Sequence, residues 1–169
     1  MEMLPVDDER AITRVLTLYC RGIDRRDFEL VRSCYHPDAT DKHGPFSGGV
    51  DGFLDYTRGQ LARFTVTMHF LGNVIVEPDP DGDPDRATAE AYAVAYHRLP
   101  ASEAKPERDY VVGLRYLDRF ERRDGHWAIA RRRCALDWHR IDPVGDVPQF
   151  PAGSLLGSAG AGDPLFDAL

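Results

Sequence analysis

Carboxylate and imidazole side chains are the groups in this chain best suited to transferring a proton. The sequence contains 28 Asp and Glu residues and six His residues. A carboxylate can orient an imidazole ring and stabilise its charged form, while the ring accepts or donates a proton near neutral pH. Asp24 is our first candidate because it ends an amphipathic segment, and His69 is a candidate partner. Spacing alone leaves open the alternative that Asp24 only caps the helix beginning near Phe28.

Three helices are predicted in the first 64 residues. They are expected over residues 7–23, 28–34 and 50–64, with residues 39–47 forming a small hairpin or a strand and a loop. The first segment has apolar side chains at the i, i+3, i+4 and i+7 positions of a helix with one buried face. Gly22 is expected to supply the positive φ of a helix terminus. This helix would direct Tyr19 and Asp24 towards the same interior.

Strand-like composition begins after the third predicted helix. Strands are expected over residues 65–77, 87–98, 109–122 and 126–138. Residues 79–84 and the pair Asp124-Gly125 mark turns, since Asp-Gly favours the positive φ angles of a type I′ hairpin. Helices followed by a meander of long strands predict an α+β fold. We expect three N-terminal helices packed in a strongly curved, mainly antiparallel sheet.

Alternation along the predicted strands decides which histidines share a face. Thr67, His69 and Leu71 lie on one face of the first long strand. In the next strand, alanines occupy every second position and the same face ends in His97. Small side chains on a concave face leave room for a ligand, so a cavity beside these histidines is one interpretation. A closely packed helix over the alanines is the other.

Length, charge and composition exclude several classes of protein. A chain of 169 residues with 43% hydrophobic side chains fits one globular domain. No apolar run approaches the roughly 20 residues of a membrane helix, and no signal peptide is recognisable, so we expect a cytoplasmic protein. A net charge of −7 argues against nucleic-acid binding. The run Arg131-Arg132-Arg133 alternates between faces of a strand, which favours a solvated edge or an internal ion pair over a basic patch.

The sequence lacks the usual signatures of metal and cofactor sites. Cys20, Cys34 and Cys134 lie far apart and without a CxxC motif, so we interpret them as reduced, packed side chains. There is no nucleophile elbow, no Gly-rich phosphate loop and no HExxH spacing. We therefore expect neither a metal nor a cofactor.

The C-terminal residues differ in composition from the rest of the chain. We divide the sequence into a domain over residues 1–142 and a tail over residues 143–169 that is rich in Pro, Gly and Ala. The tail is either a mobile arm or a lid that covers an apolar surface. As a lid, it would cover that surface with Leu155, Leu156, Leu165 and Phe166.

Four segments together resemble the SnoaL-like branch of the nuclear transport factor two-like superfamily. The segments are residues 19–28 (YCRGIDRRDF), 36–39 (HPDA), 69–70 (HF) and 120–127 (FERRDGHW). The resemblance covers about residues 7–142 and implies a cone-shaped α+β barrel. Within the superfamily, the sequence is most similar to the scytalone dehydratase-like and bile-acid dehydratase-like branch.

The resemblance also implies a set of site residues. Enzymes of this branch use an Asp–His pair, and Asp24 and His69 match its two positions. Tyr19 matches an active-site tyrosine of the bile-acid dehydratases, and His97 matches a second active-site histidine of the scytalone dehydratases. His43 stands where the scytalone dehydratases have a pocket tyrosine. Candidate substrate-lining residues are Phe53, Tyr56, Leu71 and Trp138, each of which could instead belong to the core.

By this resemblance we expect a cofactor-independent enzyme in which His69, made more basic by Asp24, removes a proton next to a carbonyl or a leaving group. Elimination, isomerisation or cyclisation of a small, apolar and cyclic polyketide-, steroid- or terpenoid-like substrate would follow. The alternative is a non-catalytic module for small-molecule binding or assembly, including a role like that of an aromatic-ring dioxygenase small subunit. By analogy, we expect a homodimer formed through the outer face of the sheet.

Overall fold

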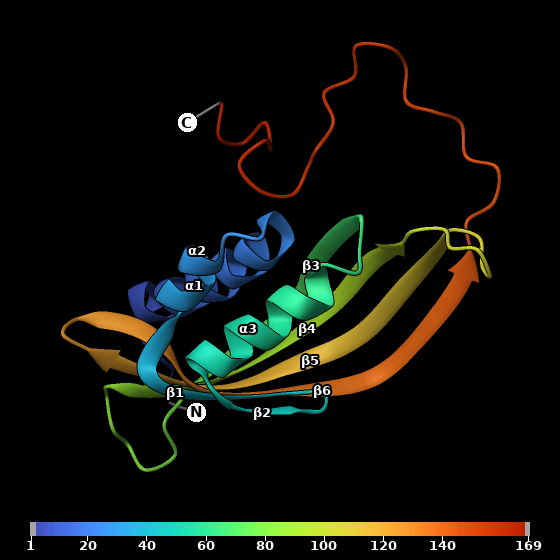
Figure 1. Ribbon diagram of the computed structural model, residues 1–169. Coiled ribbons are helices and arrows are strands. Elements are labelled where there is room, and N and C mark those ends of the chain that lie inside the picture. The colour runs from blue at the N-terminus through green and yellow to red at the C-terminus, as the bar shows by residue number, and fades with distance from the viewer. Residues whose placement is uncertain (1–2, 168–169) are drawn as a thin grey trace.

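The computed structural model describes residues 3–167, and three helices lie over the concave face of one curved sheet of six strands (Figure 1). In chain order the elements are α1 (Val6–Arg25), α2 (Phe28–Ser33), β1 (Tyr35–His43), β2 (Phe46–Gly49), α3 (Val50–Leu61), β3 (Val66–Pro78), β4 (Arg86–Leu99), β5 (Arg108–Arg123) and β6 (His126–Pro143). The sheet curls around the helices without closing. The predicted α+β fold, with three N-terminal helices in a strongly curved sheet, is confirmed. None of the helices in this part of the chain combines the length and hydropathy needed to span a membrane.

The strand order in the sheet is β2-β1-β6-β5-β4-β3. All neighbours are antiparallel except β1 and β6, which run parallel. The hairpins that join β3 to β6 form the predicted meander. Strands β2 and β3 are the two edges of the sheet, and β3 therefore has one row of backbone groups without a neighbouring strand.

Strand β1 begins earlier than the sequence predicted. We expected residues 36–38 to end the second helix and the next strand to start near Ala39, but β1 starts at Tyr35. A ring nitrogen of His36 lies 2.9 Å from the carbonyl oxygen of Glu121. Pro37 lacks a backbone N–H, and it falls where the β1–β6 register shifts, between Tyr35 and Thr40. The irregular pairing allows a proline inside a central strand.

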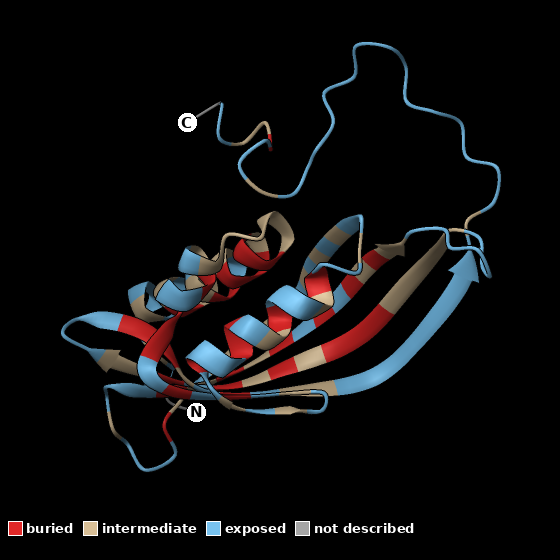
Figure 2. Cartoon of the chain, in the orientation of Figure 1, coloured by how far each residue is buried: buried red, intermediate tan, exposed pale blue. Residues whose placement is uncertain are grey.

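The helix surfaces that point towards the sheet are coloured as buried in Figure 2. Ile12, Leu16, Tyr19 and Ile23 of α1 belong to one hydrophobic core, as the helical spacing predicted. The alternating alanines of β4, from Ala87 to Ala95, are buried in the same core. Their small side chains therefore serve packing in the middle of the sheet.

A buried ion pair lies within this core. The Arg132 Nε and Nη2 atoms donate to the two carboxylate oxygens of Asp118 at 2.8 Å and 2.6 Å. The Arg132 guanidinium lies 4.0 Å from the ring centre of Tyr19 and 4.2 Å from that of Tyr116. Two hydrogen bonds and two aromatic faces replace the water that this cation loses on burial. Arg131 and Arg133 are exposed, so the predicted alternation with an internal ion pair is confirmed.

Gly22 has a different role from the one predicted. It lies inside α1, and the positive φ belongs to the C-cap residue Arg26, at 55°. A Cβ atom at Gly22 would lie 2.7 Å from Val31 Cγ2 and 3.1 Å from the carbonyl oxygen of Asp27. Glycine therefore allows α2 to approach α1 closely, and this contact sets the position of the last turn of α1.

We predict that Gly22→Ala lowers the free energy of unfolding by about 1–3 kcal/mol, because the added methyl group overlaps Val31 and nearby backbone. Gly59→Ala in α3 is the control, since no atom lies within 4 Å of the added Cβ. The control should be neutral or gain up to about 1 kcal/mol from helix propensity. Urea unfolding of both variants measures the difference, and equal values would contradict the packing role of Gly22.

Candidate active site

Asp24 and His69 form a hydrogen-bonded pair at the boundary between α1 and β3. A carboxylate oxygen of Asp24 lies 2.7 Å from His69 Nδ1, and its other oxygen accepts from the His69 backbone N–H at 2.8 Å. The Asp24 and His69 side chains are 11% and 9% exposed. The two residues predicted as a pair, 45 positions apart, are thus in direct contact.

The position of β3 at the edge of the sheet explains this geometry. The His69 N–H points away from β4, where the open edge leaves a donor without a strand partner. The last turn of α1 places the Asp24 carboxylate at that donor. A carboxylate accepts hydrogen bonds, so in the neutral form of the ring Nδ1 carries the hydrogen and Nε2 keeps a lone pair. One side chain thereby fixes both the ring orientation and the tautomer of His69.

His97 lies next to His69 on the neighbouring strand. The two ring centres are 5.6 Å apart with an interplanar angle of 67°, and the His97 ring stacks on Phe64 at 4.4 Å. Burial, followed by the nearby His69, lowers the pKa of His97 to about 4. The ring is therefore neutral at pH 7, and its buried Nδ1 has no hydrogen-bond partner. A neutral imidazole with an unpaired nitrogen thus lies beside His69, although His97 lines neither of the clefts at Asp24.

Tyr19 is buried in the core, whereas the His43 side chain is 26% exposed. Burial raises the pKa of Tyr19 well above its usual value, so its hydroxyl stays protonated. Burial, followed by the Arg132 cation, lowers the pKa of His43 to about 3. His43 Nδ1 lies 3.7 Å from the nearer carboxylate oxygen of Asp41, and neither atom has a hydrogen-bond partner.

The four predicted lining residues occupy different places. Phe53 is buried in the aromatic core, 6.4 Å from the Tyr19 ring centre. Tyr56 stacks on Phe46 beside β2, at 5.4 Å. Leu71 borders the same cleft as Asp24 and His69. Leu71 is therefore the lining residue that the structure brings to the pair.

Trp138 requires a correction, because the structure places it on the convex face of the sheet. It is 50% exposed and pairs with Gly113, and its indole occupies the space that a Cβ of Gly113 would take. Val112 and Leu114, on either side of Gly113, point into the core. The β5–β6 register shifts between Gly113 and Leu114, which the alternation in sequence could not reveal.

Sequence reasoning missed several polar atoms that are buried without a hydrogen-bond partner. They are Thr67 Oγ1, Tyr116 Oη, Arg132 Nη1 and Asp41 Oδ1. Burial raises the pKa of Asp41 to about 6, partly offset by Arg132 and by the Tyr35 hydroxyl, which donates at 2.7 Å. Alternation from His69 does place Thr67 on the inner face, and the run Arg131-Arg132-Arg133 points to Arg132, but no local pattern marks Tyr116 or Asp41. Unpaired buried polar atoms are costly, so each of them is a candidate contact for a ligand or a water molecule.

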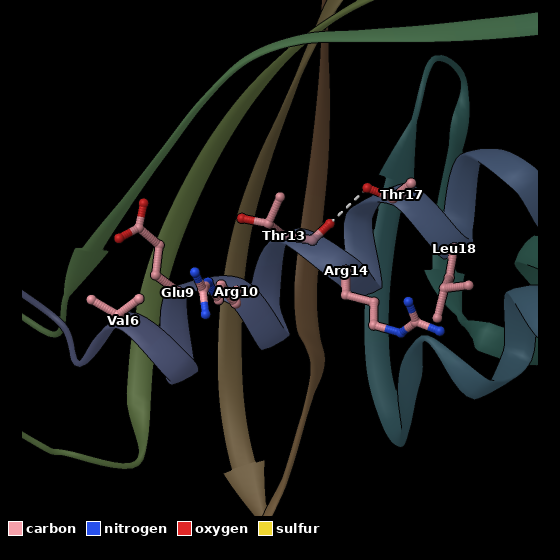
Figure 3. A pocket seen from close by; sticks show the side chains of 7 residues that line it. All are labelled: Val6, Glu9, Arg10, Thr13, Arg14, Thr17 and Leu18. Atoms are coloured by element: carbon pink, nitrogen blue, oxygen red, sulfur yellow. Dashed lines mark hydrogen bonds between the residues drawn. The ribbon is translucent and has the colours of Figure 1, made fainter.

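Two clefts meet at Asp24. One, of about 590 Å³, contains Asp24, His69 and Leu71, and the other, of about 420 Å³, contains Asp24 and Thr67. A third cleft runs along α1 and contains neither member of the pair (Figure 3). It is lined by Val6, Glu9, Arg10, Thr13, Arg14, Thr17 and Leu18. Among residues 3–167, no three His, Cys, Asp or Glu side chains gather in a way that could hold a metal ion.

Comparisons with known proteins agree with this fold. An uncharacterised protein of Mycobacterium tuberculosis is 27% identical over 136 residues, covering 78% of this chain and 87% of the relative. A Novosphingobium aromaticivorans protein assigned as a scytalone dehydratase has a TM-score of 0.70 and 21% identity, covering 85% of this chain and 97% of its own. A hexachlorocyclohexane dehydrochlorinase of Novosphingobium barchaimii has a TM-score of 0.70 and 19% identity, covering 86% of this chain and 96% of its own. At these identities the structural matches establish the fold alone.

The family follows from a separate comparison. A family model described as a SnoaL-like domain matches residues 5–133. This range includes the whole of α1 and β3, and with them Asp24 and His69. Because the match covers most of the chain, this protein belongs to the SnoaL-like domain family.

Proposed function

We propose that this protein is a cofactor-independent lyase or isomerase that transfers a proton through Asp24 and His69. The observation that carries the proposal is the pair of hydrogen bonds from the His69 ring and backbone N–H to the Asp24 carboxylate, at 2.7 Å and 2.8 Å. It leaves His69 Nε2 as a positioned base, and the carboxylate can stabilise the imidazolium that forms when the base takes a proton. Such a pair inside a SnoaL-like fold favours proton transfer over simple packing.

The chemical step needs only the groups of the chain and the substrate. His69 Nε2 takes a proton from the carbon next to a carbonyl group, and the electron pair of that C–H bond forms an enolate. In an elimination, the electron pair then expels a leaving group from the neighbouring carbon, and a departing hydroxide takes the proton from His69 as water. In an isomerisation, the same proton returns to a different carbon. In both cases His69 ends neutral.

Polar atoms near the pair are suited to stabilising the enolate oxygen. His97 is neutral at pH 7, so one ring nitrogen carries a hydrogen that can be donated without forming a full charge. Arg132 Nη1 and Tyr116 Oη are further unpaired groups in the interior, and Tyr19 is protonated. The remaining surroundings are aromatic and aliphatic, which favours a small, apolar and cyclic substrate.

We predict that Asp24→Asn lowers turnover by about 10²–10⁴-fold while the fold is retained, because an amide neither stabilises the imidazolium nor fixes the tautomer. Cyclic β-hydroxy ketones test elimination, and cyclic β,γ-unsaturated ketones test isomerisation. Asp55→Asn, an exposed change of the same kind in α3, is the control and should keep wild-type turnover. Binding of these ketones without turnover by the wild type would favour a non-catalytic module.

The low pKa of His97 predicts a pH dependence of stability. Between pH 6.5 and 4, the unfolded chain binds a proton on this residue that the folded protein excludes, so stability falls as the pH falls. The contribution of His97 to this loss is about 2 kcal/mol between pH 6.5 and 4.5. His97→Gln should remove this part of the slope in urea unfolding. His126→Gln, in the exposed β5–β6 turn, should leave the slope unchanged, and equal slopes for all three proteins would contradict the prediction.

We also infer that the homodimer expected from the resemblance forms through the convex face of the sheet. Exposed apolar side chains from neighbouring strands lie on that face. In the sheet register, Phe70 of β3 lies opposite Val94 of β4, and Gly113 of β5 lies opposite Trp138 of β6. The group comprises Phe70, Tyr92, Val94 and Trp138. Apolar groups of this kind on soluble proteins are commonly interfaces.

We predict that Phe70→Glu converts the dimer to a monomer, since it places a charge in the apolar interface. Val6→Glu, which adds the same charge to an exposed valine of α1, should leave the dimer intact. Sedimentation equilibrium measures the mass of each protein. A monomeric wild type would exclude this interface.

A further inference from the structure

We propose that residues 150–165 form a lid that completes a substrate-binding pocket at Asp24 and is held closed by Asp163. The inference rests on the proposed function, since the pocket that it completes is the one that serves Asp24 and His69. The lid belongs to the tail, which leaves the end of β6 and returns across the helices to α1 (Figure 1).

The end of the tail is attached to the last turn of α1. The Gly160 N–H donates to the carbonyl oxygen of Arg25 at 2.7 Å, and Arg25 Nε lies 3.2 Å from a carboxylate oxygen of Asp163. The Asp163 side chain is 5% exposed, against 31% for Arg25. This attachment lies directly beside Asp24 in the sequence and in space.

Asp163 also organises the tail itself. Its two carboxylate oxygens accept from the backbone N–H groups of Ser158 and Leu165, at 2.9 Å and 3.0 Å. The Asp163 N–H in turn donates to the carbonyl oxygen of Gly160 at 3.1 Å. Asp163 thus accepts two backbone hydrogen bonds and contacts one cation, which is a suitable environment for a buried carboxylate. Removing its charge would loosen both the turn and its contact with Arg25.

The tail borders both clefts that contain Asp24. Leu165 lines the cleft of about 590 Å³ together with His69. Phe150, Leu155 and Leu156 line the cleft of about 420 Å³. The lid therefore spans Asp24 and contributes apolar side chains on either side of it.

The smaller cleft has the properties of a site for an apolar molecule with one polar group. Tail side chains face Val66 and Met68 of β3 across it, yet Leu155 is 84% exposed and Met68 is 58% exposed. A ligand between these walls would bury them, and about 420 Å³ lies within the roughly 300–1,000 Å³ typical of small-molecule pockets. Thr67 Oγ1, which lacks a partner, can bind a hydroxyl or carbonyl group of the ligand. The lid would determine substrate affinity, while Asp24 and His69 carry out the chemistry.

Chymotrypsin cleavage tests whether Asp163 holds the lid closed, because the tail offers Leu155 and Leu156 as cleavage sites. Asp163→Asn should increase the cleavage rate by roughly tenfold through loss of a charge-assisted contact. Asp146→Asn, an exposed change of the same kind in the tail, should be cleaved at the wild-type rate. Equal cleavage rates for all three proteins would overturn the proposal that Asp163 holds the lid closed.

Binding of the neutral dye Nile red tests the pocket. The double change Leu155→Ser and Leu156→Ser should weaken dye binding by roughly tenfold, because it removes one apolar wall. Leu136→Ser, the same change at an exposed leucine of β6 that lines neither cleft at Asp24, should leave dye affinity unchanged. Unchanged affinity in the double variant would overturn the lid as a pocket wall. Neither measurement requires turnover, so both are independent of the proposed catalytic function. The lid proposal can be contradicted while Asp24→Asn still lowers turnover. It can also be supported while Asp24→Asn has no effect.

Discussion

The Asp24 carboxylate joins the end of α1 to the open edge of the sheet, and the geometry of the site depends on this one contact. An edge strand leaves backbone donors without partners. Here the His69 N–H is such a donor, and the carboxylate that satisfies it also binds the His69 ring. This one interaction therefore fixes the position of α1 relative to β3 and the tautomer of the His69 ring. Close packing at Gly22 supports it, because α2 can then hold the last turn of α1 in place.

The core next to Asp24 and His69 contains closely packed side chains and also buried polar atoms without hydrogen-bond partners. Arg132 is held by Asp118 and by two tyrosine rings, yet one of its nitrogens remains without a partner. Tyr116 Oη and His97 Nδ1 are unpaired as well. Buried polar atoms without partners are unfavourable in a domain that serves only as a scaffold. Of these groups, His97 lies next to the oriented imidazole of His69, which fits a protein that binds a polar group within an apolar enclosure.

The tail and the convex face both expose large apolar side chains, but their surroundings differ. Leu155 and Leu156 face β3 across a cleft beside Asp24. Phe70 and Trp138 lie on an open face of the sheet. A cleft of small-molecule size fits a ligand, whereas an open face fits another protein surface. The proposed substrate site and the proposed dimer interface therefore use different surfaces of β3, the edge beside α1 and the convex face.

The sequence by itself determined the elements, the strand faces and the residues of the pair. Periodicity of 3.6 and of 2 residues is local information, so it identified the helices, the inward direction of His69 and the alternation around Arg132. The contact between Asp24 and His69 needed the family resemblance, since no local pattern joins residues 45 positions apart. Only the tertiary structure decided the role of Gly22, the position of Trp138 and the unpaired state of Tyr116. These depend on the approach of α2, a shift in β5–β6 register and the packing of distant strands, which are interactions between segments that the order of residues does not specify.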